Sequence, residues 1–181
     1  MRFLTLAECK QFAHDAGITE EELAAATEEE SGGRAIRVAI ESERHRAFFL
    51  AKQVASLFHD FQAALMWVTD YGIWPSSENQ HLYYRLRRAA GDSGTLRDAP
   101  GHLFVKNEQD DFVTFVHLAL EFGWGVNILA KPTYRWVHAS HDGWLRIVHA
   151  PGDKDLVEEV KGWSVPFEVE TAEPEKPTRL Q

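Results

Sequence analysis

Polar residues interrupt one strongly apolar segment of the chain at helical spacing. Between Phe112 and Phe122 every residue is apolar except Thr114, His117 and Glu121, and Asp110 precedes them at the same helical spacing. Because these four recur at intervals of four, three and four residues, they form one line along a helix. The apolar remainder of that helix must be covered by protein. The line itself lies either in a cleft or toward solvent, and the sequence leaves both interpretations open.

Two capping signals predict a pair of short helices at the start of the chain. Thr5–Glu8 and Thr19–Glu22 both match a capping box, in which the Thr side chain caps the helix and the Glu reaches back. Gly17 separates the two helices. We treat residues 1–33 as a helical pair that is either part of the main domain or an arm. The second helix is rich in Glu and lacks the Arg, Lys, Asn or Gln of a DNA-reading helix.

The apolar period changes in the middle of the chain. Ile36, Val38 and Ile40 alternate with Arg37, Ala39 and Glu41, which predicts a half-buried strand. Residues 43–58 have the spacing of a helix, and residues 63–69 are typical of a buried central strand. Neither Gly nor Pro occurs between these two segments, so a helix that continues through Val68 remains an alternative.

The second half of the chain predicts one further helix, a three-strand meander and a short last helix. A helix from Ser76 or Ser77 to about Ala90 precedes a loop and the striped helix described above. The strands and the last helix are expected at residues 126–130, 134–139, 144–149 and 153–161, with Asp142-Gly143 as a hairpin turn.

These elements predict an α+β fold for residues 34–165. We expect one domain with a mixed or antiparallel sheet of about five strands, including the C-terminal meander, packed by five to six helices. The Pro residues and charges of the segment 166–181 predict a disordered tail.

Length and composition limit the number of domains and the cellular compartment that we expect for this chain. A length of 181 residues suits a single domain, and Cys9 is the only cysteine, which excludes an internal disulfide. The longest apolar runs fall far short of the ~20 residues that a membrane span requires. The apolar patch at the N-terminus is too short for a signal peptide. We therefore expect a soluble cytoplasmic protein.

The excess of acidic over basic residues is concentrated at the two ends of the chain. The net charge is −9, and residues 1–30 hold eight acidic and two basic residues, while residues 151–181 hold eight and four. Acidic ends repel nucleic acid and anionic membranes and favour basic protein partners. The sequence therefore predicts no nucleic-acid or membrane binding.

Candidate binding residues are aromatic or lie on polar helix faces. Phe49 falls among polar residues of its helix, Trp74 lies beside Pro75 in a loop, and Trp144 lies next to a hairpin tip, where exposure is expected. A helix N-terminus followed by a basic face supplies the remaining candidates, which are Ser76, Ser77, Tyr84, Arg85 and Arg88.

Two groups of residues carry the alternative of a metal-assisted hydrolase. His117 and Glu121 are spaced as a base and its orienting carboxylate, and His102 is the partner expected beside them if they are catalytic. His138, His141 and Asp142 have the side chains of a zinc site, although strand geometry does not readily bring them together.

No motif for nucleotide binding or covalent catalysis occurs in the chain. The leading hypothesis is a small interaction protein, of the adaptor, inhibitor or immunity type, that needs no cofactor. Its expected partner is another protein with a basic surface, and homo-oligomerisation stays open. We do not assign catalysis under this hypothesis.

Overall fold

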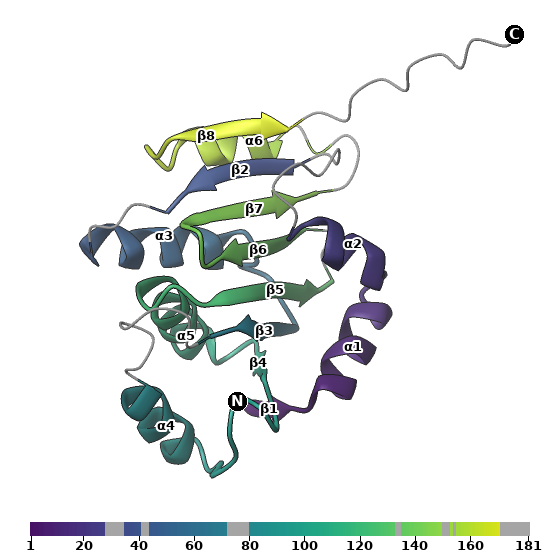
Figure 1. Cartoon of the computed structure of the whole chain (residues 1–181). Helices are drawn as coiled ribbons and strands as arrows, with labels where there is room; N and C mark the ends of the chain where they lie inside the picture. The colour runs from purple at the N-terminus through teal and green to yellow at the C-terminus, as the bar shows by residue number, and fades with distance from the viewer. Residues whose placement is uncertain are drawn as a thin grey trace, which may run out of the picture.

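The computed structural model describes residues 1–27, 35–40, 44–71, 80–132, 135–149, 153 and 155–170 (Figure 1). Within these ranges the chain forms helices and strands in one α+β domain. The helices are α1 (Leu6–Asp15), α2 (Glu20–Ala25), α3 (Arg44–Ser56), α4 (Gln80–Ala89), α5 (Gln109–Glu121) and α6 (Asp155–Lys161). The strands are β1 (Arg2–Leu4), β2 (Ala35–Ala39), β3 (Ala63–Asp70), β4 (Gly101–Val105), β5 (Gly125–Lys131), β6 (Trp136–Ser140), β7 (Trp144–Val148) and β8 (Phe167–Glu170).

All the described strands join one antiparallel sheet in the order β1-β4-β3-β5-β6-β7-β2-β8. The α+β class and the C-terminal meander, which is β5-β6-β7, are confirmed. The prediction of about five strands is wrong, because the sheet has eight. The additional strands are β1, β4 and β8, and β8 lies in the segment expected to be a disordered tail.

The boundary between α3 and β3 decides an alternative that the sequence left open. The helix ends at Ser56 and the strand begins at Ala63, so no helix continues through Val68. The connection buries Phe58 and Phe61 under the sheet. Buried aromatic side chains thus hold a turn that contains neither Gly nor Pro.

Both faces of the central strands are covered, which explains the unbroken apolar run of β3. Ala64, Met66 and Val68 belong to the large core on the side of α3 and α5. Leu65 and Trp67 belong to a smaller core on the opposite face. Helices on both sides therefore bury alternate residues of the same strand.

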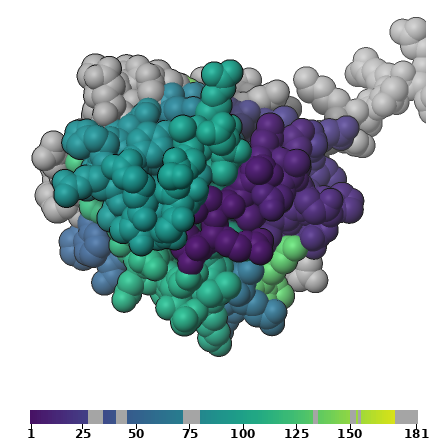
Figure 2. Space-filling view, turned by 90° about the horizontal axis from the view of Figure 1, so that it is seen from below, coloured from purple at the N-terminus to yellow at the C-terminus, as the bar shows by residue number. Residues whose placement is uncertain are grey.

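The N-terminal helices form the second layer (Figure 1). Cys9 and Ala13 of α1, and Leu23 of α2, pack in the smaller core together with Leu129 and Trp136 of the sheet. Both predicted capping boxes are present, at Thr5 and at Thr19. Figure 2 shows that the N-terminal segment, in purple, lies directly against the teal surface formed by residues around α4 and β4.

Among the described residues, no helix combines the length and apolar character needed to cross a membrane.

Candidate functional site

The polar line of α5 lies on the outer side of the domain. Asp110 and Thr114 are exposed, while His117 and Glu121 are half-buried. The His117 ring packs edge-on against Phe48 of α3, with 5.5 Å between the ring centroids. The second half of the line therefore borders α3, the helix that packs beside α5.

Two adjacent phenylalanines project from α3 at this border. Phe48 is 44% exposed and Phe49 is 61% exposed. Their rings lie 6.2 Å apart, and the ammonium group of Lys52 lies 5.8 Å from the Phe48 ring. We call Phe48, Phe49, Lys52 and His117 the α3 surface.

An open groove begins at one side of the α3 surface. It has a volume of about 310 Å³ and lies between α3 and the segment that follows α6. Phe49 and Leu50 form one wall, and Trp163 and Val165 form the other. The groove is therefore lined mainly by apolar side chains, with Arg46, Gln53 and Ser164 contributing polar atoms.

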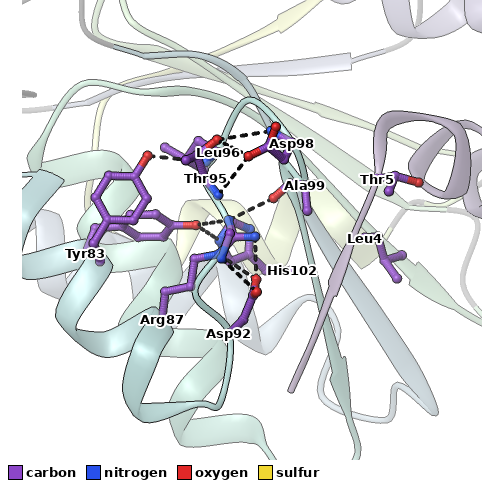
Figure 3. A network of polar contacts seen from close by, with 12 residues as sticks. Leu4, Thr5, Tyr83, Arg87, Asp92, Thr95, Leu96, Asp98, Ala99 and His102 are labelled. Atoms are coloured by element: carbon purple, nitrogen blue, oxygen red, sulfur yellow. Dashed lines mark hydrogen bonds and ion pairs between the residues drawn. The ribbon is translucent and has the colours of Figure 1, made fainter.

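The second candidate centre is a buried polar network between α4 and β4 (Figure 3). The Arg87 guanidinium donates through Nη1 to the Tyr83 hydroxyl oxygen at 2.9 Å, and this oxygen lies 2.7 Å from His102 Nε2. His102 Nδ1 lies 3.2 Å from the Met66 carbonyl oxygen. Since a carbonyl only accepts, Nδ1 carries the proton, and the Tyr83 hydroxyl donates to Nε2.

Arg87 joins this network to the loop after α4 and to β1. Its Nε donates to Asp92 Oδ2 at 2.7 Å and its Nη1 donates to the Ala99 carbonyl oxygen at 2.9 Å. The guanidinium carbon lies 4.3 Å from the centre of the Phe3 ring. Burial alone would raise the pKa of Asp92, but hydrogen bonds from Gly94 and Arg87 hold it below its ordinary value.

His102 is wholly enclosed, with no exposed surface. Burial, together with the nearby Arg87 charge, lowers the pKa of His102 to about 3. The ring is therefore neutral at physiological pH and lies inside the protein. The arrangement stabilises α4 against β4 and offers His102 no direct contact with solvent.

The structure separates the members of the predicted catalytic group. His102 contacts Phe115, on the inner side of α5, whereas His117 contacts Phe48 at the outer surface. His117 and Glu121 lie on the same outer line of α5. Catalysis by His117 with support from His102 would require the two imidazole rings to lie close together, and the fold places them on opposite sides of α5.

The predicted metal ligands also take different positions. His138 is buried, and its Nδ1 lies 2.8 Å from Asn127 Oδ1. Burial and the Arg146 and His141 charges lower the pKa of His138 to about 4. His141 lies in the β6–β7 turn, where its Nδ1 lies 3.3 Å from Asp70 Oδ2 and its Nε2 lies 3.4 Å from Asp142 Oδ1. Within the part of the chain that the structure describes, no group of three or more His, Cys, Asp or Glu residues is placed to hold a metal ion.

Trp144 does not have the exposure expected at a hairpin tip. It is 7% exposed, and the guanidinium carbons of Arg37 and Arg146 lie 4.8 and 5.0 Å from its ring. The guanidinium groups of Arg37, on the neighbouring strand β2, and of Arg146, on β7 itself, lie over the indole because the three residues share one face of the sheet. A ring covered in this way is packed as part of the domain.

The remaining candidates lie on or before α4. Tyr84 is half-buried and its hydroxyl accepts from the Leu96 N–H at 3.3 Å. Arg85 and Arg88 are exposed on the outer side of the helix. The predicted Trp74, Ser76 and Ser77 site lies outside the described residues.

Several residues of these centres were missed by the sequence analysis. Phe48 directly precedes the predicted Phe49, and two adjacent aromatic residues on a helix with an otherwise regular apolar period were an available signal. Arg87 and Trp163 gave no such signal, because their environments depend on segments distant in the sequence.

In comparisons with known protein families, curated proteins and solved structures, this chain finds no match.

Proposed function

We propose that this protein acts by binding another protein, as an adaptor, inhibitor or immunity-type protein does. The contact is made by the α3 surface and the groove beside it. The proposal depends on one observation, the exposure of Phe48 and Phe49 next to each other on one helix.

The energetics of burial favour this interpretation. A single exposed aromatic residue is ordinary on a protein surface. Two adjacent ones beside an apolar groove form a patch that loses contact with water when a partner covers it. Each phenylalanine buried in this way contributes on the order of 2 kcal/mol. Aromatic residues next to a pocket are typical centres of interfaces.

The partner's chemistry follows from the groove and from the net charge. An apolar side chain suits the walls formed by Leu50, Trp163 and Val165. The net charge of −9 and the exposed Glu20, Glu21 and Glu22 on the opposite layer favour a partner whose overall surface is basic. Because the contact itself carries Arg46 and Lys52, this attraction acts at long range and not within the contact. Association with such a partner becomes slower as the salt concentration rises.

The proposal is tested with Phe49→Asp and the matched control Leu6→Asp. Leu6 is a similarly exposed apolar residue on α1, which covers the opposite face of the sheet. Proteins retained from the source cell by the wild-type chain are identified, purified and titrated against all three forms. We expect Phe49→Asp to weaken binding by about 30-fold, as for a central interface residue, and Leu6→Asp to leave it within about twofold.

A second titration at higher ionic strength tests the charge argument. We expect the association rate constant to fall by at least about tenfold between low and moderate salt. If no purified partner distinguishes Phe49→Asp from Leu6→Asp, the α3 surface is not a binding site and the proposal is wrong.

A further inference from the structure

β8 forms one edge of the sheet (Figure 1). It pairs antiparallel with β2, and among the described residues no strand pairs with its other side. An edge strand of this kind directs N–H and C=O groups outward at alternate residues. β8 therefore offers backbone hydrogen bonds to a further extended segment.

The side chains of β8 alternate sharply in character. Phe167 packs against the large core, and Val169 lies opposite Ile36 on the same face of the sheet, yet it is 43% exposed. Glu168 and Glu170 project to the other face. An added strand would therefore meet apolar side chains on one face and carboxylates on the other.

The two carboxylates differ in their partners. Both oxygens of Glu170 accept from Arg146, at 2.8 and 3.0 Å. Glu168 is exposed and lies directly opposite Arg37 of β2 on the same face, which leaves its other side open toward the edge of the sheet. An incoming basic side chain would therefore find Glu168 accessible.

A hollow lies beside Glu168 on this face. It has a volume of about 440 Å³ and is bordered by Arg37, Trp144, Phe167 and Glu168. The hollow is open to solvent and gives room for a long side chain from a neighbouring strand. Two carboxylates border the hollow, Glu168 on β8 and Asp142 at the β6–β7 turn, together with one cation, Arg37 on β2.

A second copy of this chain is a poor occupant of the same edge. In an antiparallel pair, residues directly opposite each other lie on the same face. Two β8 strands related by a twofold axis centred on Glu168 or Val169 would place Glu168 opposite Glu168 or Glu170 of the other copy. Like charges in that position destabilise the pair.

We propose that β8 accepts an extended protein segment in which basic and apolar residues alternate. The segment adds as a further antiparallel or parallel strand through backbone hydrogen bonds. Its basic residues lie beside Glu168 and the hollow, and its apolar residues lie beside Phe167 and Val169. This inference does not depend on the α3 surface, and different substitutions test the two.

The test uses the full chain and a fluorescent peptide of alternating Lys and Val, about eight residues long. A second peptide has the same composition with all Lys residues before all Val residues. Affinities are measured by fluorescence anisotropy at low salt. We expect the alternating peptide to bind at least about fivefold more tightly, because only its pattern matches both faces of β8.

Substitutions distinguish local contact from general attraction. We expect Glu168→Lys to weaken binding of the alternating peptide by at least about fivefold and Glu168→Gln by about two- to threefold. The matched control Glu21→Lys makes the same change of charge on α2 and is expected to alter affinity by less than about twofold. Hydrogen exchange of the β8 amides is expected to slow when the peptide binds.

Several results would overturn the proposal. Equal affinity for the two peptides, or an equal effect of Glu21→Lys and Glu168→Lys, would show attraction by net charge alone. Unchanged exchange at β8 would place the peptide elsewhere. Dimerisation in sedimentation experiments that Glu168→Lys changes would assign this edge to a second copy of the chain.

Discussion

His102 is an imidazole that the surrounding protein keeps neutral. Its Nε2 accepts from Tyr83 and its Nδ1 donates to a backbone carbonyl, so both ring nitrogens are satisfied without a positive charge. The nearby Arg87 charge opposes protonation further. The residue therefore favours the folded state only while it remains unprotonated.

Lowering the pH is expected to destabilise the protein through His102. The ordinary pKa of histidine is 6.5 and that of folded His102 is about 3, so between these values the unfolded chain binds a proton that the folded chain does not. Stability is thus greatest above pH 6.5 and falls as the pH decreases. The loss between pH 7 and pH 5 is about 2 kcal/mol from this residue, and His138, with a pKa of about 4, adds to it. Urea unfolding of wild type and His102→Gln measures this loss, and equal pH dependence in both proteins would contradict the expectation.

Tyr83→Phe is expected to lower the free energy of unfolding by about 1–3 kcal/mol, because it leaves buried nitrogen atoms of Arg87 and His102 without their shared partner. The matched control Tyr84→Phe removes a half-buried hydroxyl that accepts one bond from Leu96, and a smaller loss, under about 1 kcal/mol, is expected. Chemical denaturation measures both. Similar losses of unfolding free energy in the two variants would show that the buried network stabilises the fold no more than the single hydrogen bond of Tyr84 does.

At the scale of elements, the secondary structure of some segments follows from neighbouring residues, whereas that of others depends on pairing with segments distant in the sequence. Thr5 and Thr19 mark their helices by capping chemistry that lies within four residues of sequence, and both caps are present. The β5-β6-β7 meander follows from alternating residues and the turn at Gly143, whose φ of 83° suits glycine. β1 and β4 are short, and they become strands because Phe3 pairs with His102 and His102 pairs with Met66.

The candidate site was predictable only in part for the same reason. The helical spacing of residues 43–58 placed Phe49 outside the core, and Phe49 is exposed. The groove beside it needs Trp163 and Val165, more than one hundred residues later in the chain. No local pattern around α3 indicates that these residues complete the groove.

Gly101→Ala is expected to destabilise the contact between β4 and α1 by about 1–3 kcal/mol through overpacking. A Cβ atom at Gly101 would lie 2.4 Å from Cys9 Sγ and 2.9 Å from Leu4 Cβ. Cys9→Ala removes the first of these neighbours. In urea unfolding, the double variant should therefore lose less stability than the sum of the single variants, and strict additivity would contradict a direct clash.

On the scale of the whole molecule, one sheet is shared by the two helical layers. α1 and α2 cover one face of strands whose other face holds the main core. Loss of the smaller core therefore uncovers strands that also support α3 and α5. The two layers are expected to unfold together.

Leu23→Ala tests this coupling from α2. Leu23 is buried in the smaller core, and its truncation is expected to cost about 2–5 kcal/mol. Far-ultraviolet circular dichroism and tryptophan fluorescence should still give one coincident unfolding transition at a lower urea concentration. An early, separate transition of the helical signal would show that residues 1–27 form an arm that unfolds independently.

The position of β2 between β7 and β8 has a consequence for synthesis on the ribosome. Ala35 of β2 pairs with Val148 and Glu170, which are translated more than one hundred residues after it. Ile36 and Val38 therefore have no neighbouring strand until residues 144–148 have been translated. Closure of this part of the sheet therefore follows translation of β7 and β8, and until then the nascent chain exposes an unpaired apolar strand.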